Sequence, residues 1–200
     1  MTLHRRTLMA GLPAVAAAAL PACLGRARAS EAEPRYVSFT SASALPAEER
    51  ARHERYMAKA LDLAEAEPPP PYAALIVDRS RDEIICQSAG QHREARILHA
   101  ELVALMDCGR REPRENWPNF TLYTTGEPCP MCMSATVWSR LPEVVYATSA
   151  EELAGLGVSQ FRLDSPAIAA SAPFYSGRIV GGVLRDRSYE TFRAWAASRG

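Results

Sequence analysis

Three side chains that bind transition metals lie in two short segments, and the fold of this chain must be able to bring those segments together. The first segment is His99-Ala100-Glu101 and the second is Pro128-Cys129-Pro130-Met131-Cys132. An imidazole and two thiolates suit Zn²⁺, and three protein ligands leave the fourth tetrahedral position open to water. A closed structural site uses four ligands, so this set is typical of a catalytic centre. The sequence therefore predicts one zinc ion per chain, held by His99, Cys129 and Cys132.

Strands and helices alternate along the chain, which favours an α/β layered fold. Apolar residues at helical spacing predict a helix from Pro46 to the proline run 68–71, because prolines end helices. Further helices are expected near 98–109, 131–140, 151 and 188–197, and strands near 72–77, 83–87, 120–124, 144–147 and 179–184. Both metal-binding segments then fall at helix N-termini, where the helix dipole and free N–H groups stabilise thiolates.

Glu101 follows the expected ligand His99 by two residues, which places a carboxyl beside the metal. Zinc lowers the pKa of a bound water towards ~7, which gives a hydroxide nucleophile near neutral pH. Glu101 can accept the proton of that water, protonate a ring nitrogen and then protonate a departing amine. The pattern H-x-E followed by P-C-x-x-C is typical of zinc deaminases of nucleobases. We therefore predict Glu101 to be the catalytic proton shuttle.

From roughly residue 48 to residue 195 the chain resembles the cytidine and deoxycytidylate deaminase-like family. Beyond the two motifs, the similarity is carried by residues 71–78, 121–129 and 138–147, while 172–175 and 192–195 resemble its guanine deaminase and nucleoside deaminase branch. The resemblance implies a three-layer α/β/α fold with a central mixed sheet of about five strands, one zinc ion per chain and a homodimer. Residues 95–98 depart from the Asp-Pro-Thr-Ala that usually precedes the zinc histidine, and 87–91 lack an Asn that usually meets the base.

A hydrolytic deaminase of a small-molecule nucleobase or nucleoside is the function that these observations favour, with a purine such as guanine as substrate. Aromatic faces can stack on any base, although core packing is an alternative role for such side chains. The resemblance suggests that the backbone carbonyl of Glu127 meets the substrate amine. The residues expected to contact substrate are Tyr72, Ala100, Glu127, Phe174 and Trp195.

Two other functions remain open at this point. A periplasmic thiol–disulfide oxidoreductase would use Cys129 and Cys132 as its redox pair at a helix start, but it leaves His99 and Glu101 without a role. A non-catalytic zinc-binding module would use the metal only to hold the fold. Bound zinc would distinguish a deaminase from an oxidoreductase, which needs none. Turnover of a substrate would distinguish the deaminase from a zinc-binding module.

The first 29 residues are typical of an export signal. Arg5-Arg6 precedes an apolar run from Leu8 to Leu20, and 27–29 form a small-residue cleavage site, as in twin-arginine signals. The run is shorter than the ~20 residues that span a bilayer. We therefore expect a signal peptide at 1–29, a linker at 30–46, a deaminase domain at 47–200, and a periplasmic or secreted protein without a stable membrane span. A lipid anchor at Cys23 is the alternative.

The charge of the chain is unevenly distributed. The 23 basic and 23 acidic residues balance, but four arginines lie in residues 1–29, which contain no acid. Residues 30–200 therefore carry a formal charge of about −4. Nucleic-acid backbones bind clustered Lys and Arg, so the sequence predicts no nucleic-acid partner.

Overall fold

A computed structural model describes residues 37–67, 70–89 and 95–199, and every structural statement below concerns these residues. The predicted export signal at 1–29 and the alternative anchor at Cys23 lie outside them. Within the described part of the chain, no helix combines the length and the apolar character needed to cross a membrane.

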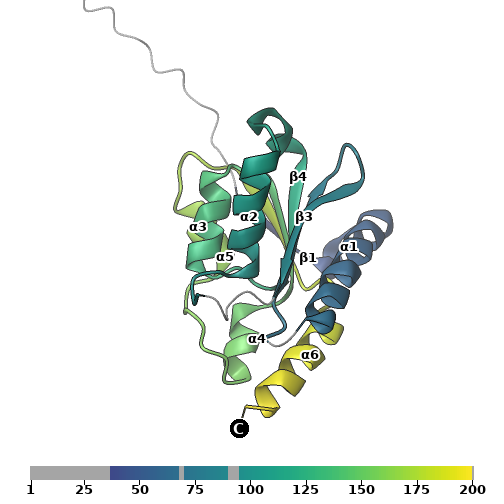
Figure 1. Ribbon diagram of the computed structural model, residues 1–200, viewed down its shortest axis with the longest axis vertical. Helices are drawn as coiled ribbons and strands as arrows, with labels where there is room; N and C mark the ends of the chain where they lie inside the picture. The colour runs from purple at the N-terminus through teal and green to yellow at the C-terminus, as the bar shows by residue number, and fades with distance from the viewer. Residues whose placement is uncertain (1–36, 68–69, 90–94, 200) are drawn as a thin grey trace, which may run out of the picture. The chain divides into compact units, whose positions relative to one another are not determined.

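The centre of the fold is a mixed six-stranded sheet with the order β1-β6-β5-β4-β2-β3 (Figure 1). Strands β4, β5, β6 and β1 run parallel to one another, whereas β2 is antiparallel to both β3 and β4. The bounds of the strands are β1 Val37–Ser41, β2 Ala73–Asp78, β3 Glu83–Ala89, β4 Phe120–Gly126, β5 Glu143–Thr148 and β6 Gly177–Gly181. The predicted mixed sheet is confirmed, with β1 as an additional strand.

Helices cover both faces of the sheet and complete the three layers. The helices are α1 Ala47–Ala66, α2 Ala100–Arg111, α3 Pro130–Trp138, α4 Ala150–Gly155, α5 Ser165–Ala170 and α6 Arg185–Ala197, with 3₁₀ turns at η1 Ala42–Ala44 and η3 Arg114–Asn119. Helix α1 packs on β2, β4 and β5, and α6 packs on β5. On the opposite face, α2 packs on β2 and β3, and α3 lies beside α2 (Figure 1) and also contacts α5.

The two larger core clusters lie on opposite faces of the sheet, because successive residues of a strand point to opposite sides, and a smaller third cluster joins Leu153, Val158 and Phe192. In β4, Leu122 belongs to the cluster under α2 and α3, whereas Tyr123 belongs to the cluster under α1. Every residue of β4 and β5 is buried. Both central strands are therefore shielded from solvent on both sides, as expected where both faces of a sheet are covered.

The prediction of a linker over residues 30–46 is wrong for 37–44, which form β1 and η1. Strand β1 pairs in parallel with β6 at the edge of the sheet, and three of its five residues are exposed. The alternation Val37-Ser38-Phe39-Thr40 is its short local signal, while its pairing with β6 rests on backbone hydrogen bonds that every non-proline residue can make. The domain consequently begins earlier than the predicted residue 47.

The C-terminal part also differs from prediction in two places. Strand β6 ends at Gly181 rather than at residue 184, because Gly182 adopts a φ of 86°, which ends extended pairing. Helix α5 was not predicted. Asp164 caps it by accepting a hydrogen bond from the N–H of Ala167 at 2.8 Å, and Pro166 lies in its first turn, where proline is tolerated.

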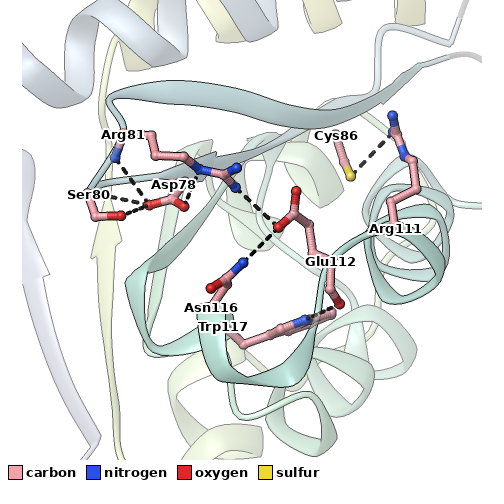
Figure 2. Close-up of polar contacts among 8 residues, drawn as sticks. All are labelled: Asp78, Ser80, Arg81, Cys86, Arg111, Glu112, Asn116 and Trp117. Carbon is pink, nitrogen blue, oxygen red and sulfur yellow. Dashed lines mark hydrogen bonds and ion pairs between the residues drawn. The ribbon is translucent and has the colours of Figure 1, made fainter.

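A polar network fixes the C-terminal end of α2 to the β2–β3 turn (Figure 2). Asp78 accepts hydrogen bonds from the side chains of Ser80 at 2.6 Å and Arg81 at 2.7 Å. Arg81 also pairs with Glu112, which follows α2, and Asn116 of η3 donates to the same carboxylate at 3.0 Å. The network therefore links the C-terminal end of α2, the helix that carries Glu101 near its other end, to the β2–β3 turn.

Candidate metal centre

The three predicted ligands lie at the N-termini of α2 and α3, as the sequence predicts. His99 is the N-cap residue of α2, and Cys129 is the N-cap residue of α3. Pro130 occupies the first turn of α3, where its missing N–H costs no hydrogen bond. Cys132 lies one turn into that helix and is fully buried. Parallel strand β4 ends at Gly126, so the centre lies just beyond the carboxyl end of the sheet, where α/β proteins place their ligand sites.

The geometry of the three side chains fits zinc. Their ligand atoms all lie within 4.8 Å of one another, and Cys129 Sγ is 3.5 Å from His99 Nδ1. A sulfur and a nitrogen at about 2.3 and 2.0 Å from a tetrahedral Zn²⁺ are separated by roughly 3.6 Å. A hydrogen bond with Cys132 and the proximity of His99 lower the pKa of the Cys129 thiol to about 4. Cys129 is therefore a thiolate, the form of cysteine that binds metals.

Glu101 is the second residue of α2, and its side chain is buried beside these ligands. Burial raises the pKa of Glu101 to about 7, and the charge of Cys129 adds to this rise. A carboxyl with a pKa near 7 can both accept and donate a proton at neutral pH. The centre thus combines a three-ligand metal set with an acid–base group.

A cavity of about 350 Å³ opens over the centre. Its wall includes His99, Glu101 and Cys129 from the metal-binding segments, and Tyr72, which precedes β2. The rest of the wall comes from elsewhere in the chain: Pro70, Glu127, Val158, Ser159, Gln160, Phe161 and Arg199. Concave sites of this size suit small organic molecules.

Tyr72 is held in the cavity wall from two sides. Its hydroxyl accepts a hydrogen bond from Gln160 Nε2 at 3.1 Å, and its ring meets Phe192 edge to face at 4.8 Å. A Cβ atom on Gly126 would lie 3.0 Å from the Tyr72 ring, so a larger residue at the end of β4 would have to displace that ring by a few tenths of an ångström. The ring centroid of Trp195 lies 6.3 Å from that of Tyr72, and Trp195 is not among the residues that line the cavity. Trp195 therefore packs against Tyr72 from outside the cavity.

The other residues expected to contact substrate are Phe174, Ala100 and Glu127, and only Glu127 lines this cavity. Phe174 packs against Trp138 at 4.9 Å and lines a separate cavity, because the segment after α5 returns along α3. The structure therefore does not place Phe174 at this centre. Ala100 is 1% exposed and packs in the core beneath α2. Glu127 does line the cavity, but both oxygens of its carboxylate accept hydrogen bonds from α4 and α5.

Sequence reasoning missed the part of the wall that lies between α4 and α5. Gln160 and Phe161 belong to no recognisable motif, and a long-range contact with Tyr72 leaves no periodic signal in the sequence. The Asp164-Ser165-Pro166 start of α5 was the one local signal available, since Asp before Pro is a common helix beginning.

Comparison with known proteins assigns the chain to a family. Residues 50–148 match the family described as "Cytidine and deoxycytidylate deaminase zinc-binding region". The tRNA-specific adenosine deaminase of Rickettsia felis is 31% identical over 120 residues, which cover 59% of this chain and 80% of that protein. The chain belongs to the cytidine and deoxycytidylate deaminase family. Among its other relatives, the guanine deaminase of Bacillus subtilis is 31% identical over 101 residues, covering 48% of this chain and 61% of that protein.

Solved structures support the same fold for this deaminase-family member. The structure of NE0047 in complex with 2,6-diaminopurine has a TM-score of 0.65 and 23% identity, covering 74% of this chain and 83% of that one. The guanine deaminase from Nitrosomonas europaea has a TM-score of 0.60 and 22% identity, covering 76% and 94%. The predicted family and fold class are therefore confirmed.

Proposed function

We propose that this protein is a zinc-dependent hydrolytic deaminase that converts an exocyclic amine of a nucleobase or nucleoside to a carbonyl and releases ammonia. The observation that carries the proposal is the arrangement of the centre. A three-ligand set of catalytic type and a buried carboxyl with a pKa near 7 open into one cavity beyond the end of β4. Membership of a deaminase family supports the same chemistry.

The residues of the centre have distinct roles in this reaction. His99, Cys129 and Cys132 would hold the zinc, which when bound makes water a nucleophile near neutral pH. Glu101 accepts one proton from water as it attacks the ring carbon and passes this proton to the ring nitrogen. It then accepts the proton of the hydroxyl group that has formed on the ring carbon and passes it to the amine, so that ammonia leaves and a carbonyl remains. Tyr72 offers an aromatic surface for the base, and the backbone carbonyl of Glu127 accepts a hydrogen bond from the amine.

A purine such as guanine is the substrate class that we favour. The named relatives are deaminases of adenosine in tRNA and of guanine, and one similar structure holds 2,6-diaminopurine. The charge of about −4 on residues 30–200 favours a small molecule over tRNA. We further propose that the protein is a homodimer, and that it is exported to the periplasm or the medium.

The two other functions are less well supported. Family membership and the proximity of His99 to Cys129 support a role for His99 as a metal ligand. A thiol–disulfide oxidoreductase has no need of such a ligand. A non-catalytic zinc module requires a fourth protein ligand. Among the described residues, the metal-binding group consists of His99, Cys129 and Cys132, which is three ligands rather than four.

The decisive experiment is an assay of ammonia release. Residues 30–200, produced with zinc, would be tested on guanine, adenine, cytosine, their nucleosides and a tRNA, beside a Glu101→Ala variant. Release from one substrate, lost in the variant while about one zinc per chain remains, supports the proposal and identifies the base. Bound zinc without turnover on any of them favours the binding module, and a zinc-free disulfide would overturn the proposal.

A further inference from the structure

The side chain of Glu127 makes contacts that substrate binding does not require. Glu127 is 4% exposed, and its Oε2 accepts a hydrogen bond from the N–H of Ala150 at 2.8 Å. Its Oε1 accepts two more from Ser165, from the N–H at 2.8 Å and from Oγ at 2.6 Å. Its own N–H donates to the carbonyl of Thr148 at 2.8 Å. Both carboxylate oxygens are therefore engaged within the protein.

These contacts connect the metal-binding segment with both ends of one wall of the cavity. Glu127 lies two residues before Cys129 in the sequence. Ala150 begins α4 and Ser165 begins α5, so the two residues flank the segment that brings Gln160 and Phe161 to the cavity. One carboxylate thus joins three parts of the site that are far apart in sequence.

The segment between α4 and α5 has few other contacts that could fix it. Val158 is buried against Leu153 and Phe192, but residues 161–164 are all exposed, with Phe161 67% exposed. Segments with few buried contacts open locally at low cost, so their position depends on how their ends are held. Bonds from N–H groups to a buried carboxylate are among the stronger hydrogen bonds in proteins.

We propose that Glu127 is a positioning residue, whose carboxylate holds residues 150–165 against the metal-binding segment so that Gln160 can reach Tyr72 across the cavity. The proposal rests on the proposed function, in which this cavity binds the substrate. Glu127 acts through the wall that it holds. Its loss should weaken substrate binding more than it slows the chemical step.

The test compares the full zinc-loaded chain with its Glu127→Gln variant. Glutamine keeps the size of the side chain but turns one oxygen into an N–H donor, which cannot accept from a backbone N–H. We expect amide hydrogen exchange in residues 150–165 to accelerate about ten-fold or more, the loss typical of a bond to a charged group. We also expect KM to rise about ten-fold while kcat changes less than about three-fold, since uniform binding is lost. Zinc content should stay unchanged.

Two further variants keep the test sharp. Glu151→Gln removes a neighbouring exposed carboxylate on α4 and should leave exchange and kinetics as in the wild type. Ser165→Ala removes only the Oγ contact and should move exchange in the same direction by a smaller factor. It also tests the proposal if Glu127→Gln fails to fold.

The exchange measurement needs no substrate, so it tests the contact even if no deamination is found. Wild-type exchange in residues 150–165 of folded Glu127→Gln would overturn the proposal. A fall in kcat with unchanged KM would also overturn it, because it would place Glu127 in the chemical step.

Discussion

Two clusters that each contain one histidine lie on opposite faces of the sheet. His99, Cys129 and Cys132 form one cluster, and Glu49, His53 and Glu143 form the other. In both, the potential ligand atoms lie within 4.8 Å of one another. The His99 cluster contacts α2 and α3, whereas the His53 cluster lies between α1 and the sheet. Proximity of ligand atoms alone therefore does not distinguish them.

The His53 cluster already contains its own cation. The guanidinium of Arg178 contacts Glu49 and lies 3.7 Å from Glu143. His53 is fully buried, and its Nδ1 is 2.9 Å from the hydroxyl of Tyr123. One guanidinium of the protein thus lies between the two acids, and the hydroxyl of Thr121 donates a hydrogen bond to Glu143 at 2.8 Å.

The His99 cluster differs in donor type and in access. Its two sulfur donors suit zinc, whereas the His53 cluster offers two carboxylates in their place. It opens into a cavity of about 350 Å³, and Glu101 forms part of the wall of that cavity. The comparison teaches that soft donors, an open position and a nearby acid–base group mark the reactive cluster.

Replacing a ligand should empty only the His99 cluster. In Cys132→Ser we expect bound zinc to fall well below one per chain and ammonia release to fall by about 10³-fold or more, because metal and nucleophile are lost together. Metal analysis beside the ammonia assay measures both quantities. The matched change Glu143→Gln in the other cluster should leave zinc content unchanged, and a loss of zinc there would contradict the comparison.

Removing the acid–base group should separate metal binding from chemistry. Glu101→Gln should retain about one zinc per chain, while kcat falls by roughly 10²- to 10⁴-fold, the usual contribution of a positioned proton-transfer group. Steady-state kinetics on the identified substrate would measure the change. Activity within a factor of three of the wild type would show that Glu101 is not the proton shuttle.

The Arg178 cation should matter for stability rather than for activity. In Arg178→Met, the buried Glu143 and the partly buried Glu49 lose the guanidinium that lies between them, and we expect the free energy of unfolding to fall by about 2 kcal/mol. Denaturant unfolding would measure this loss. Arg52→Met removes a more exposed cation 3.7 Å from the same Glu49, and it should cost no more than about 0.5 kcal/mol.

The pH dependence of stability should reveal the buried imidazole. Burial lowers the pKa of His53, although the nearby Glu143 opposes this shift, as does Glu49, while Arg52 and Arg178 add to it. The unfolded state therefore takes up a proton first as the pH falls through about 6.5, and stability decreases from that point downward. In His53→Gln this part of the pH dependence should disappear. Denaturant unfolding of both proteins from pH 8 to pH 5 would measure this. The difference between their free energies of unfolding reports on His53 alone, because His99 is present in both.

Much of the site could be predicted from sequence because its information is local. The residue types at 99, 129 and 132 define a zinc-binding donor set, and their positions at helix beginnings follow from strand-to-helix junctions such as Gly126 to Pro130. Helix α1, strand β4 and the two helices that carry the ligands follow from apolar periodicity and proline placement. These features depend on neighbours a few residues apart.

Only the tertiary structure decided which distant groups meet. The pairing of β1 with β6, the contact of Gln160 with Tyr72, and the placement of Phe174 beside Trp138 all join segments that no local pattern connects. The same holds for Glu127, whose partners are backbone N–H groups that every non-proline residue possesses. Such contacts form only when folding brings residues that are far apart in sequence next to one another. The sequence therefore determines the chemistry of the centre, while the fold determines the walls around it.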